Sequence, residues 1–352
     1  MKLIKEQVAL ISDLHVGLHG SSTQWHKIIL NFAHWLKETL LSNNIKDIII
    51  AGDILDDRNE VPVTTLQQLS KFFEILDCFN IIVLVGNHDC YYNKRSDVHS
   101  LDLLDQWENI TVIDKLTTIT SHEKMLTFVP WNTPLDEIPN SDIIFGHFDI
   151  KTFKMNSRRI CEYGINSNDL LTKADLIITG HFHLTEARKY SNGTIVYLGS
   201  PYEQNWGEAN SPKGIYLLDI PTKNANFIPN LQSPRHRKVR LSELIAVGKL
   251  TSTIKKEFAD NIVSFIVDAK ANPQMIESLI NKFSLLKPLE LKVEYSTIGN
   301  IEVIDEIDFV FSGINIQGDI EEFIKNLENF DKKEELTNYL QEVYKKVETK
   351  NG

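Results

Sequence analysis

Five short motifs in this sequence carry side chains that can bind a metal ion or transfer a proton. Each follows a short apolar run, such as Ile81–Val85, which is typical of a strand buried on both faces of a sheet. Because open α/β sheets place their ligands at the carboxyl ends of strands, we expect the motifs to meet at one site. In chain order they are DLH at 13–15, GD at 52–53, GNHD at 86–89, GH at 146–147 and GHFH at 180–183.

The donor atoms of these motifs suit two divalent ions better than one. Carboxylates, imidazoles and an amide oxygen favour Mn²⁺, Fe or Zn²⁺, and one catalytic ion typically uses only three protein ligands. Two ions roughly 3.5–4 Å apart can share a bridging carboxylate. Asp53 is the natural bridge, because it is the lone ligand at the end of its strand. We assign Asp13, His15 and His183 to one ion, and Asn87, His147 and His181 to the other.

The two remaining polar residues of the GNHD motif are candidates for the chemical step. Two ions of this kind activate a water molecule and neutralise a phosphate group during an in-line displacement. We expect His88 to stabilise or protonate the leaving oxygen, because an imidazole changes its protonation near neutral pH. Asp89 either orients the His88 ring or caps the next turn, and the sequence leaves both roles open.

Helices and buried strands that would position the motifs alternate up to about residue 220, which predicts an α/β domain. We expect helices over Ser22–Ser42, Val61–Phe79 and Ser96–Trp107. Besides Ile81–Val85, the expected strands are Gln7–Ser12, Asp47–Ala51, Met125–Pro130, Asp142–Phe145, Leu176–Thr179, Thr194–Leu198 and Gly214–Asp219.

The sequence changes character after residue 220. Pro221, Pro229 and Pro234 indicate a connection rather than a core element. A strand–helix–strand pattern from Ile262 to Tyr295 predicts a small unit without a ligand cluster. The stretch Asp319–Val347 has two amphipathic stripes, which fit either a helix pair packed on its own domain or a helix–loop–helix offered to another subunit.

Charge and composition limit the function classes. The net charge of −11 argues against indiscriminate binding of nucleic acid, although metal ions and a local basic patch can still contact phosphates. The segment 227–240 contains no acidic residue, and is either a DNA-binding patch or a solvated linker. Its candidate DNA contacts are Arg235, Arg237, Lys238 and Arg240.

Three scattered cysteines are too few for a disulfide framework and fit a reducing cytosol. No apolar stretch approaches the roughly 20 residues that span a bilayer, and the amino terminus lacks the pattern of an export signal. We therefore expect a cytoplasmic protein.

The five motifs, in this order, resemble the calcineurin-like metallophosphoesterase superfamily. Within it the chain resembles the SbcD/Mre-type DNA repair nuclease subunit, most closely the version carried by T-even-type bacteriophages. Asp56 departs from the pattern, because several cellular relatives have a histidine three residues after the bridging aspartate, and no role of that histidine is carried over. The resemblance rests on ISDLHVG at 11–17, IIIAGDILDDR at 48–58, VGNHD at 85–89, FGHFDI at 145–150, TGHFH at 179–183 and YLGSPYEQNWGE at 197–208.

The resemblance implies a fold class and a division into domains. The expected fold is α/β: a two-sheet metallophosphoesterase sandwich flanked by helices, a small α+β DNA-capping domain and a C-terminal helix–loop–helix. The corresponding residues are 1–220 for the nuclease domain, 221–312 for the capping domain and 313–352 for a helical segment on which an ATPase docks.

The resemblance also implies an activity and partners. It suggests a nuclease dependent on two divalent ions, with Mn²⁺ expected and Mg²⁺ as the alternative, that degrades duplex ends 3′→5′ and cuts single strands. The expected assembly is a homodimer within a heterotetramer that contains an SbcC-type, SMC-like ATPase. The expected setting is DNA recombination, repair and recombination-dependent replication in the cytoplasm of a phage-infected bacterium.

Two other functions compete with this interpretation. The first is a phosphomonoesterase or cyclic phosphodiesterase that acts on a small substrate, and the second is a scaffold whose metal site is vestigial. The extra residues after the motifs, which carry no ligand cluster, favour the nuclease, because a small substrate requires no capping or docking module. The presence of every ligand type together with His88 argues against the scaffold.

Overall fold

The computed structural model describes residues 3, 5–92, 95–247, 252–269 and 271–296. The expected ATPase-docking segment 313–352 and residues 297–312 of the expected capping domain lie outside the described residues. The described strands form two six-stranded sheets and one three-stranded sheet. None of the helices in this part of the chain is long and apolar enough to cross a membrane.

The first sheet contains the strands that precede the first three motifs. Its order is β12-β11-β1-β2-β3-β4, and the pairs from β1 to β4 are parallel. The strands are β1 (Gln7–Ile11), β2 (Asp47–Ile50), β3 (Asn80–Leu84), β4 (Ile110–Ile113), β11 (Gly214–Asp219) and β12 (Asn224–Pro229). Because β1, β2 and β3 run in the same direction, the motifs that follow them lie at the same edge of the sheet.

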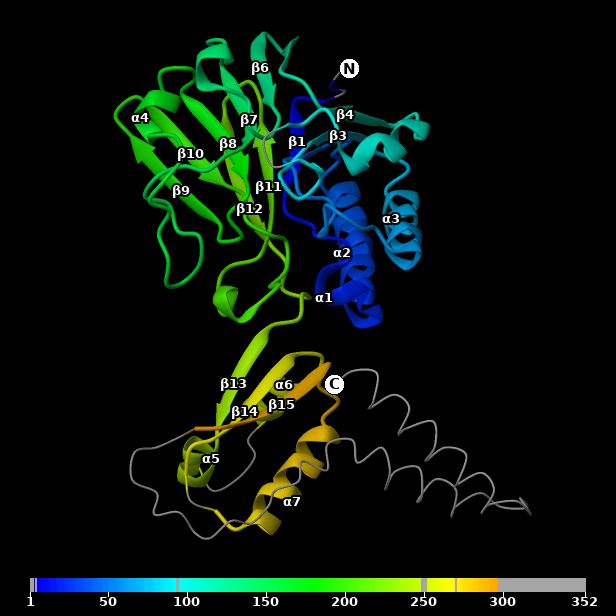
Figure 1. The fold of residues 1–352 in the computed structure, drawn as a ribbon, viewed down its shortest axis with the longest axis vertical. Coiled ribbons are helices and arrows are strands. Elements are labelled where there is room, and N and C mark those ends of the chain that lie inside the picture. The colour runs from blue at the N-terminus through cyan, green and yellow to red at the C-terminus, as the bar shows by residue number, and fades with distance from the viewer. Residues whose placement is uncertain (1–2, 4, 93–94, 248–251, 270, 297–352) are drawn as a thin grey trace, which may run out of the picture. The chain divides into compact units, whose positions relative to one another are not determined.

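Alternate residues of the parallel strands face two different layers. Ile48 and Ile50 pack in the layer formed by helices α2 (Thr23–Ser42) and α3 (Val63–Ile75), which cover one face of the sheet (Figure 1). Ile49, between them, packs in the apolar layer that separates the two six-stranded sheets. Burial on both faces explains why these strands read as continuous apolar runs.

The second sheet delivers the last two motifs. Its order is β5-β6-β7-β8-β10-β9, with β6, β7, β8 and β10 parallel to their neighbours in that run. An outer layer that includes Phe148, Phe153 and Leu170 covers its far face. The strands are β5 (Thr117–Ser121), β6 (Lys124–Val129), β7 (Ile143–His147), β8 (Leu176–Gly180), β9 (Glu186–Tyr190) and β10 (Gly193–Tyr197).

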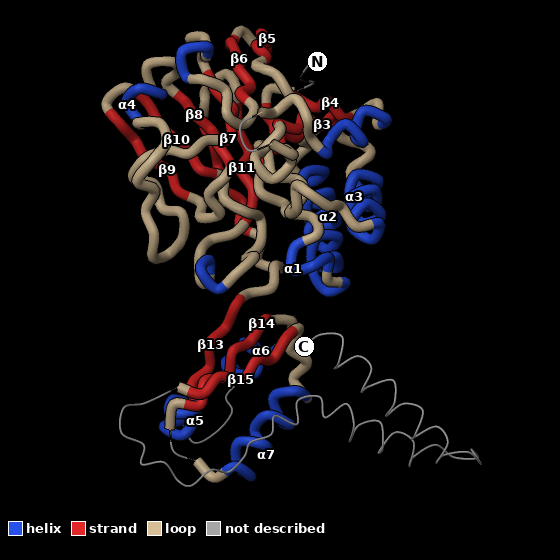
Figure 2. The backbone as a smooth tube through the Cα atoms, in the orientation of Figure 1, coloured by secondary structure: helices blue, strands red, loops and turns tan. Residues whose placement is uncertain are grey.

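The third sheet has its own helices and its own apolar core (Figure 2). Its three parallel strands are β13 (His236–Arg240), β14 (Ile262–Val267) and β15 (Glu290–Tyr295). Its helices are α5 (Leu241–Val247), α6 (Ser252–Phe258) and α7 (Pro273–Ser284). The expected strand–helix–strand unit is therefore present, with β13 added to it.

Two local expectations differ from the structure. The helix expected over Ser96–Trp107 is a 3₁₀ helix, η1 (Ser100–Gln106), whose first turn is capped when the His99 ring accepts from Leu101 N. The proline-rich connection after residue 220 contains a strand, β12. Pro229 is tolerated there because it ends an edge strand, where a missing N–H costs no ladder hydrogen bond. The other short helices are α1 (Leu18–Ser21), α4 (Ser167–Leu170), η2 (Leu135–Glu137) and η3 (Trp206–Glu208).

Candidate metal centre

The polar motifs meet at the carboxyl ends of five strands, three from the first sheet and two from the second. Their side chains form three groups in which one donor atom of each residue lies within 4.8 Å of the others. The groups are Asp13–His15–His183, His15–Asp53–His88 and Asp53–His147–His181. Asn87 extends the third group, because its Oδ1 lies 2.9 Å from His147 Nε2. The structure thus brings all seven expected ligands together, with Asp53 in two of the groups.

Four of these ligands have a left-handed backbone, which L-residues other than glycine rarely adopt. Their φ angles are 56° at Asp13, 47° at His15, 54° at Asp53 and 93° at His181. Each such residue costs on the order of 1–3 kcal/mol and persists only where its surroundings determine it. Hydrogen bonds between the first two motif loops supply that support, from Asp13 N to Gly52 O and from His15 N to Asp53 O, both 3.1 Å long.

Glycine is required at two motif positions because the loops approach each other closely. A Cβ atom at Gly86 would lie 2.3 Å from Asp53 Oδ1, and one at Gly180 would lie 1.9 Å from Ser12 Oγ. Either contact is far inside van der Waals distance, so a larger residue would push two ligand-bearing loops apart. The glycines that precede the ligands therefore set how closely the strand ends can converge.

Each of the four expected histidine ligands has one ring nitrogen near an oxygen of the protein. The contact is a hydrogen bond for His147, His181 and His183, whereas His15 Nδ1 lies near its carboxylate without a hydrogen bond to it. A nitrogen that donates its proton in this way leaves the other nitrogen with a lone pair for a metal ion. The pairs are His15 Nδ1 with Asp56 Oδ1 at 3.2 Å, His147 Nδ1 with Ala51 O at 2.7 Å, His181 Nε2 with Asp149 Oδ1 at 2.9 Å, and His183 Nδ1 with Glu208 Oε1 at 2.8 Å.

The fit of this site to a cation is clearest at His15 and His183. Their Nε2 atoms lie only 3.1 Å apart, and the opposite nitrogen of each ring faces a carboxylate. Two nitrogen atoms this close need a proton or a cation between them, because two facing lone pairs would repel each other. Together with the nearby Asp13 carboxylate, this donor set suits a divalent ion.

Asp53, the expected bridging ligand, and the histidines beside it shift each other's pKa values. Burial alone would raise the pKa of Asp53, but His147 and His15 outweigh it and hold this pKa well below its usual range. Burial lowers the pKa of His147, but the Asp53 carboxylate, 3.2 Å away, more than offsets this and raises it to about 9. Without metal, His147 therefore carries a proton that a bound cation must displace.

His88 is held at two points. Its backbone N donates to Asp53 Oδ1 over 2.8 Å, and its Nδ1 lies within hydrogen-bonding distance of Asp56 O. Because a carbonyl can only accept, Nδ1 carries the proton of the neutral ring. Nε2 is then the ring nitrogen that can exchange a proton with a substrate.

Asp89 does not orient the His88 ring: among the described residues, its carboxylate accepts hydrogen bonds from backbone amides. Oδ2 accepts from Asp53 N and Gly86 N, and Oδ1 accepts from Ile54 N and Leu55 N, over 2.9–3.1 Å. Burial, together with the Asp53 charge, raises the pKa of Asp89 to about 7, against the lowering effect of the amides. Asp89 thus ties the loop after β2 to the loop after β3.

The outer partners of the histidines are residues that motif reasoning did not identify. Asp149 and Glu208 are separated from the histidines they contact by 32 and 25 residues. Both lie in segments that carried the resemblance, FGHFDI and YLGSPYEQNWGE, which was the available signal. Asp56, the departure from the family pattern, contacts His15 through its side chain and His88 through its carbonyl.

The expected DNA contacts of the basic segment differ in their exposure. Lys238 and Arg240 are exposed on β13, whereas the Arg235 side chain is mostly buried. Arg235 Nη1 also donates to Ser211 O over 2.8 Å. The described partners are Glu203 for Arg235 at 3.2 Å, Asn210 for Arg237 at 2.8 Å, Asp268 for Arg240 at 3.4 Å and the Trp206 ring beneath Lys238 at 5.5 Å.

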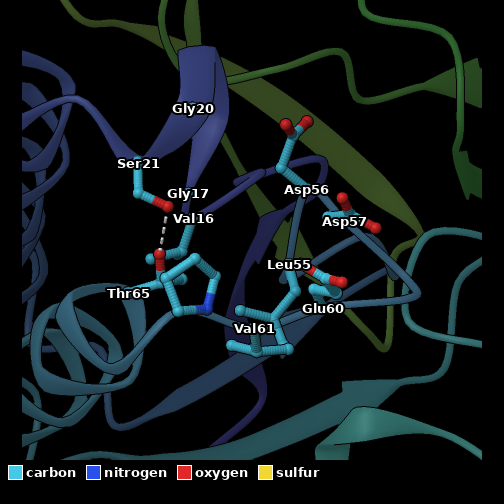
Figure 3. A pocket seen from close by; sticks show the side chains of 11 residues that line it. Val16, Gly17, Gly20, Ser21, Leu55, Asp56, Asp57, Glu60, Val61 and Thr65 are labelled. Atoms are coloured by element: carbon cyan, nitrogen blue, oxygen red, sulfur yellow. Dashed lines mark hydrogen bonds between the residues drawn. The ribbon is translucent and has the colours of Figure 1, made fainter. Parts of the chain in front are cut away.

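A pocket of about 190 Å³ adjoins the metal centre at Asp56 (Figure 3). Asp57 and Glu60 also line it, and a 2.7 Å hydrogen bond between Ser21 Oγ and Thr65 Oγ1 lies on its wall. Three carboxyl groups in so small a space disfavour an anionic ligand. We therefore do not assign a phosphate to this pocket.

Replacing Asp89 with asparagine should destabilise the protein. The amide nitrogen of the new side chain cannot accept, and each buried N–H left without an acceptor costs about 1–3 kcal/mol. Each carboxylate oxygen accepts from two amides, so two N–H groups lose their acceptor and the free energy of unfolding in urea should fall by about 2–6 kcal/mol. It should not change for the exposed Asp105→Asn control. An Asp89→Asn variant with wild-type stability would show that the loops do not depend on this carboxylate.

Divalent metal should stabilise the fold, because the ligands come from both large sheets. A ligand that binds only the folded state contributes about 2.7 kcal/mol when its concentration is 100 times the dissociation constant. Calorimetry should therefore give a higher melting temperature with Mn²⁺ than with EDTA. In Asp53→Asn, which alters the shared ligand, most of this increase should disappear. An undiminished increase would show that the metal acts elsewhere.

Comparison with known proteins gives three informative relatives. Exonuclease subunit 1 of Enterobacteria phage T4 is 28% identical over 241 residues, which cover 65% of this chain and 69% of that protein. DNA double-strand break repair protein Mre11 of Nanoarchaeum equitans is 20% identical over 261 residues, which cover 63% of this chain and 68% of that protein. The SbcCD nuclease subunit of Staphylococcus epidermidis is 25% identical over 219 residues, covering 52% of this chain and 58% of that protein.

Solved structures align only loosely: an archaeal phosphodiesterase gives a TM-score of 0.36 at 14% identity, over 64% of this chain and 99% of that one. The family model named calcineurin-like phosphoesterase matches residues 7–184, which are half of the chain. This range includes all seven expected ligands and His88. The chain belongs to the calcineurin-like phosphoesterase family.

Proposed function

We propose that the protein is a DNA nuclease that uses two divalent ions, most favourably Mn²⁺, to hydrolyse phosphodiester bonds. The observation that carries this proposal is that the buried Asp53 lies within ligand distance of His15, a member of one ligand group, and of His147 and His181 in the other. One group contains Asp13, His15 and His183, and the other contains Asn87, His147 and His181. Two ions held there would activate a water molecule and neutralise the phosphate oxygens during an in-line displacement.

The residues of the chain have separate tasks in this proposal. Asp53 sets the spacing of the two ligand groups. The Asp89 carboxylate fixes the loop that bears Asp53, because it accepts hydrogen bonds from the backbone amides of that loop. In its doubly protonated form His88 gives the Nε2 proton to the leaving oxygen and becomes neutral, while Nδ1 keeps its own proton and its bond to Asp56 O. His15 lies beside it, with a ring-centroid distance of 4.6 Å, so the proton donor adjoins the first ligand group.

DNA is the proposed substrate because the three relatives are named as an exonuclease subunit, a double-strand break repair protein and a nuclease subunit. We propose 3′→5′ degradation of duplex ends and cutting of single strands. The exposed Lys238 and Arg240 on β13 are the members of the basic segment best able to contact DNA phosphates.

Two of the relatives are named as subunits, which supports a role within an assembly. We propose a homodimer that works with an SbcC-type ATPase in DNA recombination, repair and replication in the cytoplasm of a phage-infected bacterium. Exposed apolar side chains at Val63, Tyr91 and Tyr92 lie in or near the segments 61–79 and 91–107 where we expect the dimer contact.

Nuclease activity on end-labelled duplex and single-stranded DNA tests the proposal. With Mn²⁺ the wild type should release nucleotides, and His88→Ala should reduce kcat by about 10²–10⁴-fold, the usual contribution of a general acid. Metal content should stay unchanged in this variant, and the exposed His34→Ala on α2 is the matched control. Hydrolysis of a nitrophenyl phosphate ester, without cleavage of any DNA even when the ATPase is present, would favour a small-substrate phosphoesterase instead.

Salt dependence of DNA binding tests the basic strand. Lys238→Ala should reduce the slope of log K against log salt by about one unit, because one phosphate contact is lost. The control is Lys189→Ala, an exposed lysine on the edge strand β9. Arg235→Ala should instead lower stability, since it removes a mostly buried ion pair with Glu203. An unchanged slope for Lys238→Ala would exclude β13 from the DNA interface.

A further inference from the structure

We propose that a buried ion pair, Glu208 with Lys213, fixes the orientation and tautomer of His183 and thereby sets the affinity of one of the two metal sites. Both are positioning residues: they contact His183 and not the ions. The inference rests on the proposed two-metal site, but not on DNA being the substrate. It concerns the segment between β10 and β11, which contains none of the expected ligands.

The pair is withdrawn from solvent. Glu208 and Lys213 are each 1% exposed, and Lys213 Nζ lies 2.6 Å from Glu208 Oε2. Burying two charges costs several kcal/mol per ion and is tolerated only when geometry and additional hydrogen bonds compensate. A pair of this kind contributes little net stability, so its presence beside an expected ligand calls for a role other than stability.

The Glu208 carboxylate is fully occupied, with five hydrogen-bond donors around its two oxygens. Oε1 accepts from His183 Nδ1 and from Asn205 Nδ2, at 2.8 and 2.7 Å. Oε2 accepts from Ser200 Oγ, Gln204 N and Lys213 Nζ, at 2.9, 3.2 and 2.6 Å. With this many contacts the carboxylate cannot rotate without breaking several of them. The proton acceptor of His183 therefore has a fixed position.

Lys213 holds His183 from its other end. An ammonium group has three donors, and those of Lys213 go to Glu208 Oε2, to Ser200 Oγ at 2.7 Å and to the backbone oxygen of His183 at 2.7 Å. The lysine therefore holds the backbone of His183 directly and its ring through Glu208. Its positive charge also balances the carboxylate, so the pair adds no net charge beside the expected cation.

The fixed ring has a direct consequence for metal binding. With Nδ1 donating to Glu208, His183 leaves Nε2 as the nitrogen that can bind a cation, and this atom lies 3.1 Å from His15 Nε2. Gln204, in the same segment, donates from Nε2 to Asp13 O over 2.6 Å, and the Tyr202 hydroxyl donates to Leu14 O. The segment Ser200–Lys213 thus supports the backbone of one ligand group and the ring of His183.

The other ligand group has different supports. His147 is held by Ala51 O, and His181 is held by Asp149 Oδ1. Asp149 is therefore the counterpart of Glu208 at the second site, and the two carboxylates can be varied independently. Substitution of an outer partner of this kind typically costs about 10–100-fold in metal affinity.

Mn²⁺ binding to the full-length protein, followed by the electron paramagnetic resonance of free Mn²⁺, tests the proposal. The wild type should bind two ions, and Glu208→Gln should weaken one of them by about 10–100-fold while leaving the other unchanged. Asp149→Asn is the matched substitution at the second site, and it should weaken the ion held by His147 and His181 instead. In a His183→Ala background, Glu208→Gln should cause no further loss, whereas Asp149→Asn should still do so.

A second measurement reports the tautomer itself, with His183→Ala used to assign the His183 signals among those of the eleven histidines. Nitrogen-15 spectra of the histidine-labelled, metal-free wild type report which ring nitrogen of His183 carries the proton, and we expect Nδ1. A proton on Nε2 with none on Nδ1 would overturn the proposal, as would two wild-type affinities in folded Glu208→Gln or a wild type that binds no Mn²⁺. A protein that binds two ions as described but cleaves no DNA would contradict the proposed nuclease and leave this inference standing.

Discussion

A single buried carboxylate connects nearly every part of this site. Asp53 has a left-handed backbone, its amide donates to Asp89, and its carbonyl accepts from His15 N. Its Oδ1 accepts from His88 N, and its Oδ2 lies 3.2 Å from His147 Nε2. Such a charge is costly to bury unless it is paired and hydrogen-bonded, and here every neighbouring loop contributes to that compensation. The loops at this edge of the sheets therefore lie where they can hydrogen-bond to Asp53 and pair with its charge.

The two sheets explain why that compensation is available. Parallel strands bring Asp53 and His88 to the edge from the first sheet, and His147 and His181 from the second. The apolar layer between the sheets fixes their separation, so the histidine side chains from one side reach the carboxylates from the other. The glycines before the ligands then let the backbones approach to distances that a Cβ atom would forbid. Packing and chemistry therefore depend on the same few residues.

Much of this arrangement could be predicted from sequence, because a buried parallel strand and its terminal ligand leave a local signal. Runs such as Ile81–Val85 followed by Asn87 and His88 combine both in a few residues. The partners of the histidines leave no local signal of their pairing, since the contact of Glu208 with His183 arises only when distant segments fold together. Their one signal was that they lie in segments that carried the resemblance. The role of Asp89 stayed open for a related reason. Its carboxylate binds backbone amides, which have no identity in the sequence.

The order of the ligands along the chain has a consequence for synthesis. One ligand group begins at Asp13 but ends at His183, and the other ends at His181. The segment that supports His183 follows later still, up to Lys213. A nascent chain therefore holds neither complete site until the last motif has left the ribosome, although its first sheet strands and helices can already have formed. The metal centre is thus completed only once the last motif and its supporting segment up to Lys213 are available, while β11–β15 still follow in the chain.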